Sequence, residues 1–179
     1  MVRLSVGQVT FDLITDAGVF SAGRIDRGTF VLLESLPAPP QNGNLLDLGC
    51  GYGVIALVLA KRTRATVWAV DVNARALDLV RVNAERLKLP NVIVAAPDQV
   101  PERIYFDAIY SNPPVRIGRQ RLRPLIQWWL NRLTVEGAAY LVISRHLGAD
   151  PLARWLTDQG FSVVRIRSKG AYRVIRVTR

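Results

Sequence analysis

The stretch Asp47–Gly53 reads Asp-Leu-Gly-Cys-Gly-Tyr-Gly and combines a carboxylate with glycines at alternate positions. It follows a short apolar run and precedes the long apolar, alanine-rich segment Val54–Ala60. This pattern predicts a buried strand, a tight glycine turn and a helix whose N-terminal amides face a ligand. Glycine tolerates the positive φ angles and the close ligand approach that such a turn requires. We therefore expect a ligand-binding loop that contains Gly49, Cys50 and Gly51.

The position of Asp47 narrows the choice of ligand. Dinucleotide-binding folds hold a pyrophosphate with the spacing G-x-G-x-x-G, whereas the spacing here is G-x-G-x-G. A carboxylate just before the first glycine would repel a pyrophosphate but suits an ammonium group. The next apolar run ends in Asp71, where an acid is placed to bind ribose hydroxyls. A ligand that carries both an ammonium group and a ribose is S-adenosylmethionine; the alternative is a ligand-free glycine turn.

Asn112-Pro113-Pro114 is the second motif that could have a catalytic role, and it follows an apolar run that predicts a strand. Ligands of open α/β sheets bind beyond the carboxyl ends of the strands, so we expect it at the same edge as the glycine turn. The prolines restrict the backbone and remove two donors, which leaves carbonyls able to accept. The Asn112 amide oxygen and the Pro113 carbonyl can together hold an amino group on a planar ring, with its lone pair toward a methyl donor. Catalysis would then rest on positioning and electrostatics. The structural alternative is an ordinary turn.

The charge balance indicates the class of partner. The 179 residues carry 24 basic and 14 acidic side chains, a net charge of +10, and nearly all the cations are arginine. This excess favours a polyanionic partner, with nucleic acid ahead of a membrane. The alternative is a solvated arginine-rich surface, because no basic run gathers the charge locally. Arginines past Asn112 are candidates for phosphate contacts or for a solvated helix face: Arg116, Arg119, Arg121 and Arg123.

Composition also sets the expected domain organisation and location. Half of the residues are hydrophobic (50%), and the length suits one domain over 1–179 with a substantial core. We expect residues 1–40 to cap the cofactor site and residues 41–179 to form the core. The sequence shows neither a membrane-spanning run nor the apolar region of a signal peptide, and its single cysteine excludes an internal disulfide, so we expect a cytoplasmic protein. One cysteine and one histidine give no zinc-site spacing, so we expect no metal.

The elements that must position these residues alternate along the chain. We predict strands at 45–48, 66–70, 92–96, 105–110 and 138–144, helices at 54–62, 73–88, 119–133 and 150–158, and a terminal hairpin at 161–167 and 172–177. Short strands within 4–14 and a helix at 27–36 that is N-capped by Asp26 precede them. This order predicts a doubly wound, mostly parallel, seven-stranded Rossmann-like α/β sheet with helices on both faces. The hairpin must add one antiparallel strand.

The combined motifs resemble the class I S-adenosylmethionine-dependent methyltransferases, and among them the methyltransferase small domain family. That family includes small-subunit ribosomal RNA guanine 2-amino methyltransferases. The resemblance runs from about Phe11 to Arg173 and is carried by these segments: Thr15–Ser21, Asp26–Thr29, Asp47–Gly53, Asp71, Ser111–Pro114 with Gly118, and Gly170–Val174. It implies an rRNA processing enzyme that transfers a methyl group from S-adenosyl-L-methionine to the guanine 2-amino group of RNA.

The resemblance also implies roles for single residues. Asp71 with Val72 would hold the ribose end of the cofactor, and Asp98 the adenine amine. Phe20 and Thr29 would lie over the cofactor, and Asn112 would hold the target amine. The neighbours of this asparagine would bind the substrate: Pro114, Val115 and Arg116.

Two features leave other interpretations open. Many amine-methylating relatives carry an aromatic residue after the two prolines, whereas this chain has Val115, so Phe20 is our candidate for stacking on the base. The alternatives are methylation of a glutamine side-chain amide in a protein, or a non-catalytic cofactor-binding RNA module. We interpret Cys50 as a small packing residue and not as a nucleophile. His146 reads as a surface residue, and Trp128 and Trp129 read as core residues.

Overall fold

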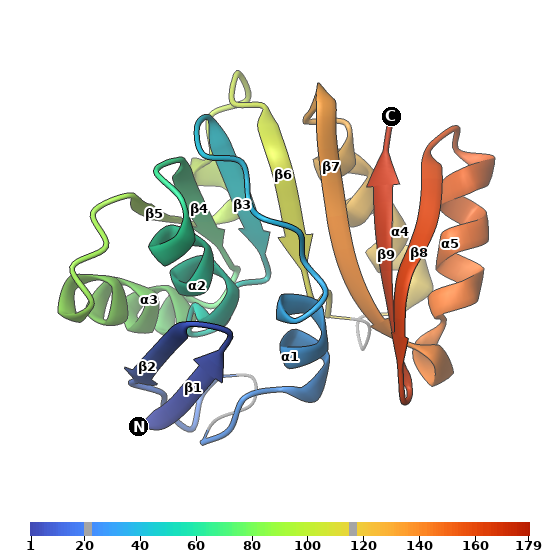
Figure 1. Cartoon of the computed structure of the whole chain (residues 1–179). Helices are drawn as coiled ribbons and strands as arrows, with labels where there is room; N and C mark the ends of the chain where they lie inside the picture. The colour runs from blue at the N-terminus through green and yellow to red at the C-terminus, as the bar shows by residue number, and fades with distance from the viewer. Residues whose placement is uncertain (20–22, 115–117) are drawn as a thin grey trace.

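The computed structural model describes residues 1–19, 23–114 and 118–179. Its elements follow the predicted alternation (Figure 1): β1 Val2–Val6, β2 Val9–Leu13, α1 Arg27–Leu33, β3 Asn44–Leu48, α2 Val54–Arg62, β4 Thr66–Val70, α3 Ala74–Arg86, β5 Val92–Ala95, η1 Pro97–Gln99, β6 Phe106–Ser111, α4 Arg119–Leu130, β7 Leu133–Ser144, η3 Arg145–Leu147, α5 Ala149–Asp158, β8 Ser162–Lys169 and β9 Tyr172–Thr178.

The described strands β3 to β9 form one seven-stranded sheet in the order β5-β4-β3-β6-β7-β9-β8. The pairs from β5 to β7 are parallel, and β9 runs antiparallel to both β7 and β8. Thus β9 is the one strand that opposes the others, as the terminal hairpin required. The strand order reverses beside β3, so the glycine turn after β3 lies at the switch point where open sheets bind ligands. The predicted doubly wound Rossmann-like fold is confirmed.

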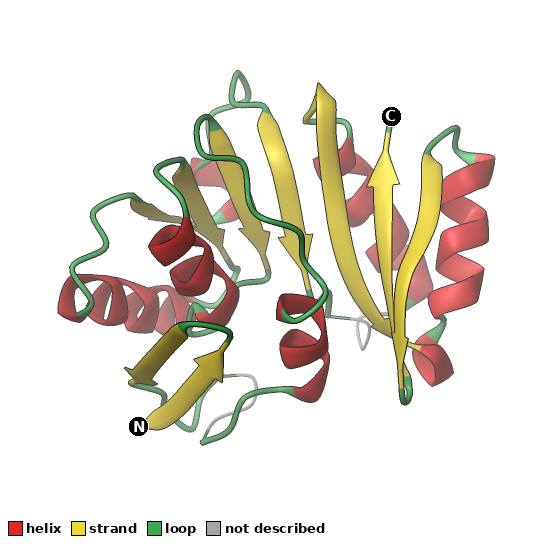
Figure 2. Ribbon diagram, in the orientation of Figure 1, coloured by secondary structure: helices red, strands yellow, loops and turns green. Residues whose placement is uncertain are grey.

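Helices cover both faces of this sheet (Figure 2). One apolar core lies under α1, α2 and α3, and it includes Leu32, Leu57 and Val80. The other core lies under α4 and α5, with Trp129 and Leu156. The buried strands are apolar on both faces because both are covered.

The N-terminal hairpin β1–β2 forms a separate two-stranded sheet and packs its apolar face into the first core. The residue that follows β2, Ile14, is hydrogen-bonded to Asn83 on α3, whose side chain is 1% exposed. The Asn83 amide accepts a hydrogen bond from Ile14 N at 2.8 Å and donates to Ile14 O at 2.9 Å and Tyr52 O at 3.3 Å. One buried amide therefore joins the N-terminal segment to the glycine loop.

Three predicted boundaries are wrong by three or more residues. The helix predicted to end at Leu133 ends at Leu130, with Asn131 as its C-cap, because Leu133 is fully buried and starts β7 opposite Phe106. The strand predicted at 138–144 therefore begins five residues earlier, at Leu133. The helix predicted to reach Leu36 ends at Leu33, since the residue before a proline disfavours helical dihedrals.

Within the described part of the chain, none of the helices combines the length and apolar character needed to cross a membrane.

Candidate active site

The glycine turn after β3 adopts the backbone that the sequence pattern predicts. Gly49, Gly51 and Gly53 have φ angles of 74°, 53° and 94°. The Gly49 and Cys50 amides donate to Val70 O at 2.8 and 3.1 Å, which ties the turn to the end of β4. A Cβ atom on Gly51 would meet nothing within 4 Å, so this side of the turn is open. The geometry leaves space over the loop for a ligand.

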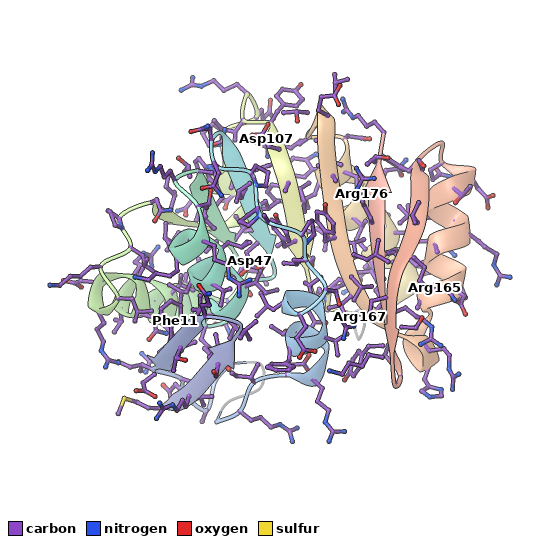
Figure 3. The ribbon with its side chains drawn as sticks, viewed as in Figure 1. Phe11, Asp47, Asp107, Arg165, Arg167 and Arg176 are labelled. Atoms are coloured by element: carbon purple, nitrogen blue, oxygen red, sulfur yellow. The ribbon has the colours of Figure 1, made fainter. Side chains whose placement is uncertain are left out.

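Asp47 lies beneath the turn, between β3 and α2 (Figure 3), and its side chain is fully buried. Its Oδ2 accepts a hydrogen bond from Ala56 N at 2.9 Å, so the carboxylate caps α2, whose N-cap Gly53 has no side chain. Its Oδ1 has no partner among the described residues. Burial, followed by the nearby negative charge of Asp71, raises the pKa of Asp47 to about 8 against the Ala56 hydrogen bond. A cation bound above the turn would favour the charged form of this carboxylate.

We expect Asp47→Asn to flatten the pH dependence of folding stability in the ligand-free protein. The pKa of Asp47 rises from 3.8 to about 8 on folding, so between these values the folded state holds a proton that the unfolded state has lost. Stability contributed by this group is therefore complete below pH 3.8 and is lost as the pH rises toward 8, by up to about 1.4 kcal/mol per pH unit.

Urea unfolding at pH 5, 6 and 7 checks this expectation. The wild type should lose stability over this series relative to Asp47→Asn, whose amide oxygen still accepts from Ala56 N. The exposed Asp12→Asn is the matched control and should keep the wild-type slope. Equal slopes in wild type and Asp47→Asn would contradict the raised pKa.

Asp71 follows β4 and is hydrogen-bonded to the glycine turn at Gly51. Its Oδ2 accepts from Gly51 N and its Oδ1 from Asn73 N, both at 2.9 Å. The carboxylate therefore connects the turn to the start of α3. Val72 beside it is 87% exposed, and Asp98 is exposed in η1 beyond the neighbouring strand β5. The residues predicted to bind the ribose (Asp71 and Val72) and the adenine (Asp98) thus follow the adjacent strands β4 and β5.

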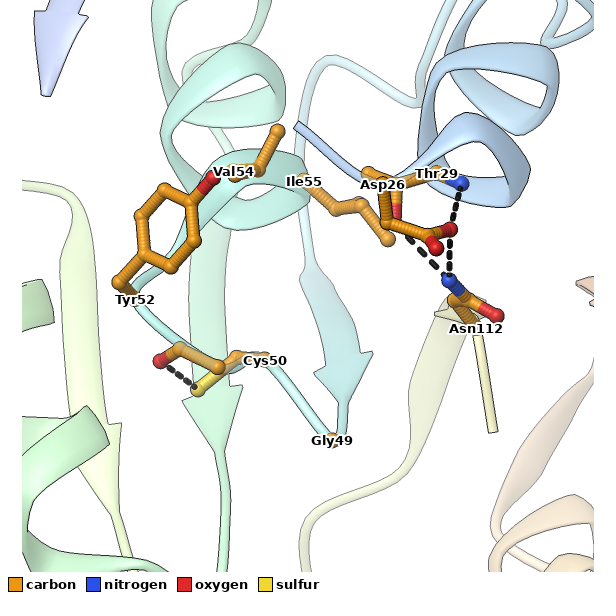
Figure 4. Close-up of a pocket in the computed structure, with 9 residues that line it drawn as sticks. Asp26, Thr29, Gly49, Cys50, Tyr52, Val54, Ile55 and Asn112 are labelled. Carbon is orange, nitrogen blue, oxygen red and sulfur yellow. Dashed lines mark hydrogen bonds between the residues drawn. The ribbon is translucent and has the colours of Figure 1, made fainter. Parts of the chain in front are cut away.

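Asn112 lies at the end of β6, and its amide has a defined orientation. Its Nδ2 donates to Asp26 Oδ2 at 2.7 Å and to Thr29 Oγ1 at 3.0 Å (Figure 4). The two donor hydrogens are thereby used, and the oxygen Oδ1 points away from Asp26. The side chain can present an acceptor to a ligand.

The residues around Asn112 bring the β6 end against the glycine turn. Ser111 Oγ donates to Leu48 O at 2.7 Å, which joins the ends of β6 and β3. Pro113 is buried and Pro114 is exposed. A Cβ atom built on Gly49 would lie 3.9 Å from Pro114 Cδ, so the second proline borders the turn.

A pocket joins these parts at the carboxyl edge of the sheet (Figure 4). Its walls come from α1, the glycine turn, the start of α2 and the end of β6: Asp26, Thr29, Gly49, Cys50, Gly51, Tyr52, Val54, Ile55 and Asn112. It brings together Thr29, the glycine turn and Asn112, which sequence reasoning assigned to one site. Asp47 and Asp71 do not line the pocket. Asp47 lies beneath the turn, and Asp71 accepts a hydrogen bond from Gly51 N, whose residue does line the pocket.

Four residues of the pocket were not predicted as site residues from the sequence: Asp26, Tyr52, Val54 and Ile55. The sequence identifies Asp26 as a helix cap and as part of the family segment Asp26–Thr29, and Tyr52 as a member of the turn, with no role in the site for either residue. Asp26 does cap α1, by accepting from Thr29 N at 2.9 Å, but the same oxygen also contacts Asn112. Tyr52 is 3% exposed and donates to Arg24 O at 2.9 Å. Only the Asp-x-x-Thr spacing before a helix could have drawn attention to Asp26.

Three predicted site residues lie outside the described residues: Phe20, Val115 and Arg116.

The remaining candidates take ordinary structural positions. Cys50 is 7% exposed, and burial raises the pKa of its thiol, which suits packing and not nucleophilic attack. His146 is exposed. Trp129 is a core residue, but the prediction for Trp128 is wrong: it is 48% exposed and lies edge-on to the Trp129 ring. Arg123 lies over the Trp155 ring at 5.2 Å.

In the described ranges, no group of three or more histidine, cysteine, aspartate or glutamate side chains is arranged to hold a metal ion.

Comparison with known proteins gives the family context of this site. The family model described as "Methyltransferase small domain" matches residues 10–176. The uncharacterized protein YbxB of Bacillus subtilis (strain 168) is 32% identical over 170 residues, which cover 93% of this chain and 85% of that protein. The ribosomal RNA small subunit methyltransferase C of Hahella chejuensis is 38% identical over 152 residues, which cover 82% of this chain but 43% of that protein.

Solved structures share the fold. The T. thermophilus 16S rRNA N2 G1207 methyltransferase (RsmC), in complex with AdoMet and guanosine, superposes with a TM-score of 0.84 at 24% identity. The match covers 99% of this chain and 49% of that one, so this chain spans about half the length of the rRNA methyltransferases that it matches. A methyltransferase from Pyrococcus furiosus superposes with a TM-score of 0.72 at 20% identity, over 93% of this chain and 87% of that one.

Proposed function

The chain belongs to the methyltransferase small domain family, and from this premise we propose that it methylates an exocyclic amine of an RNA base with S-adenosylmethionine. The amine that we propose is the 2-amino group of a guanine in small-subunit ribosomal RNA. The observation that carries the proposal is the orientation of the Asn112 amide. Asp26 and Thr29 take its hydrogens, so its oxygen is available to accept from an amine.

The cofactor site that we propose is built from the loop after β3 and the ends of β4 and β5. Its residues are Asp47, Gly49, Cys50, Gly51, Asp71, Val72 and Asp98, with Phe20 and Thr29 over the cofactor. The buried Asp47 carboxylate, with one oxygen lacking a partner among the described residues, fits a cationic ligand above the turn. S-adenosylmethionine supplies the electrophilic methyl group when bound.

The protein's own contribution to the transfer is to hold the amine. The Asn112 oxygen and the Pro113 carbonyl accept its two hydrogens, which keeps the nitrogen lone pair out of conjugation with the ring. Positive charge develops on this nitrogen as the new bond forms, and preorganised acceptors stabilise that charge. Pro114, Val115 and Arg116 would contact the base. The target base must be unpaired or flipped out of its helix, because a stacked base cannot enter such a pocket.

Charge and family relatives support RNA as the substrate. The net charge is +10, and exposed arginines lie on the terminal strands β8 and β9, among them Arg165, Arg167 and Arg176 (Figure 3). Arg165 is paired with Asp150 at 2.9 Å. Several relatives are named ribosomal RNA small subunit methyltransferase C, and the solved T. thermophilus relative binds guanosine. A cytoplasmic location follows from such a substrate.

We also propose that residues 1–40 and 41–179 act as one functional unit. The hydrogen bonds from Asp26 and Thr29 to Asn112 connect the first segment with the second across the pocket.

We expect RNA binding to weaken steeply with salt. The visible source of affinity is arginine charge against phosphate, and each phosphate contact adds about −0.7 to −0.9 to the slope of log K against log salt. Fluorescence anisotropy with a labelled single-stranded RNA between 50 and 300 mM salt measures this slope. A flat salt dependence, or equal binding of an acidic protein, would favour the protein substrate instead.

Transfer of label from S-adenosylmethionine tests the substrate class directly. Purified protein is incubated with labelled cofactor and with separate RNA, DNA and protein fractions of a cell extract. The proposal predicts label in the RNA fraction. Label in protein would indicate glutamine-amide methylation, and cofactor binding without any transfer would indicate a non-catalytic RNA-binding module.

A further inference from the structure

The Asp26 side chain makes contacts that a helix cap alone does not require. Its Oδ2 accepts from Thr29 N at 2.9 Å, which is the capping bond, and also from Asn112 Nδ2 at 2.7 Å. The Asp26 and Asn112 side chains both line the pocket, although 86 residues separate them in sequence. One carboxylate oxygen thus connects the start of α1 with the end of β6.

This contact decides which way the Asn112 amide faces. An amide group carries its two donors on nitrogen and its acceptor sites on oxygen. A flipped amide would direct Oδ1 at the Asp26 carboxylate, so that two acceptors face each other and the 2.7 Å bond is lost. The flipped amide would also lose its donation to Thr29 Oγ1, now 3.0 Å from Nδ2. A hydrogen bond to a charged acceptor is roughly twice as strong as a neutral one, so the carboxylate dominates this choice.

We propose that Asp26 is a positioning residue for methyl transfer: its carboxylate holds the Asn112 amide with the oxygen toward the target amine. The inference rests on the proposed function of Asn112 and extends it to a residue outside the Asn-Pro-Pro segment. Thr29 assists as the second acceptor.

The substitution Asp26→Asn separates this role from helix capping. Asparagine caps helices as well as aspartate does, so α1 keeps its N-cap. The oxygen that caps α1 is also the one that accepts from Asn112, so an asparagine at position 26 offers Asn112 a neutral acceptor in place of a charged one and holds its orientation less strongly. Asp26→Ala is unsuitable, because it removes the cap together with the orienting group.

We expect Asp26→Asn to lower kcat by roughly 5- to 10-fold, the factor that corresponds to replacing a charge-assisted hydrogen bond by a neutral one. The Kd for S-adenosylmethionine and the Tm should stay near the wild-type values. Asp12→Asn, a neutralised exposed carboxylate on β2, is the matched control and should leave kcat unchanged.

A double variant distinguishes positioning from a general electrostatic effect. In the Asn112→Ala background no amide remains to be oriented, so adding Asp26→Asn should change the residual rate little. Independent effects that multiply in the double variant would overturn the proposal, as would a loss of cofactor affinity equal to the loss of kcat.

A nuclear magnetic resonance measurement keeps the inference testable if no RNA is methylated. The Asn112 side-chain NH₂ signals are assigned by their absence in Asn112→Ala. We expect these signals to move in Asp26→Asn and to stay in place in Asp12→Asn. Unchanged signals would overturn the orienting contact itself, whereas moved signals in a protein without RNA methylation would count against the proposed function alone.

Discussion

Replacing Asn112 with alanine should reduce methyl transfer by about 10²-fold or more while S-adenosylmethionine affinity stays nearly unchanged. In the function that we propose, the amide contacts the target amine, so its loss should appear in kcat and not in cofactor binding. Removal of one preorganised polar group that stabilises transition-state charge costs about this factor in well-studied enzymes. Single-turnover rates with saturating RNA, together with calorimetric cofactor titrations, measure the two quantities.

The control for this variant is Asn131→Ala, an exposed asparagine that follows α4 far from the pocket. It should transfer methyl groups at the wild-type rate. Asn112→Asp adds a sharper comparison: it keeps the size of the side chain but sets a second carboxylate against Asp26, so we expect it also to be inactive. Full activity in Asn112→Ala would show that the Asn-Pro-Pro segment is only a turn.

Replacing Asp71 with alanine should weaken S-adenosylmethionine binding by about 10- to 100-fold, since a charged hydrogen bond contributes about 1.5–3 kcal/mol. The structure adds a second reason, because the Asp71 carboxylate also accepts from Gly51 N and Asn73 N. Its removal leaves the glycine turn without that anchor. Isothermal titration calorimetry measures the change in Kd.

Asp78→Ala provides the matched control, because Asp78 lies on α3 and its exposed carboxylate is paired with Arg81. It should bind the cofactor as the wild type does. Wild-type affinity in Asp71→Ala would refute the assignment of Asp71 as the ribose ligand.

Local sequence patterns were sufficient to predict the fold because strand and helix signals alternate with few interruptions. The turn after β3 needed glycines with positive φ angles, and the prediction of β4 at residues 66–70 agrees with the structure to the residue. The errors at the boundary between α4 and β7 fall where burial overrides local periodicity. Leu133 continues the apolar spacing of α4, yet full burial beside Phe106 makes it the first residue of a strand.

The site was only partly predictable for a similar reason. The sequence could place the glycine turn and Asn112 at one edge of the sheet, because each directly follows a predicted strand. The carboxyl ends of parallel strands lie at the same edge. The contact between Asp26 and Asn112 depends on how α1 docks against β6, which no local pattern encodes. Likewise, spacing suggested that Asp47 faces a ligand, whereas only packing reveals that it is fully buried and caps α2.

Nucleoside analysis of methylated RNA tests the central proposal most directly. RNA labelled by the protein from S-adenosylmethionine is digested to nucleosides, which are separated and identified by mass spectrometry. The account predicts that the methyl group lies on the 2-amino group of guanosine, and that this product disappears with Asn112→Ala. A methyl group on adenine, on cytosine or on a ribose hydroxyl would contradict the proposed target, and RNA without any methyl group would contradict the proposed function.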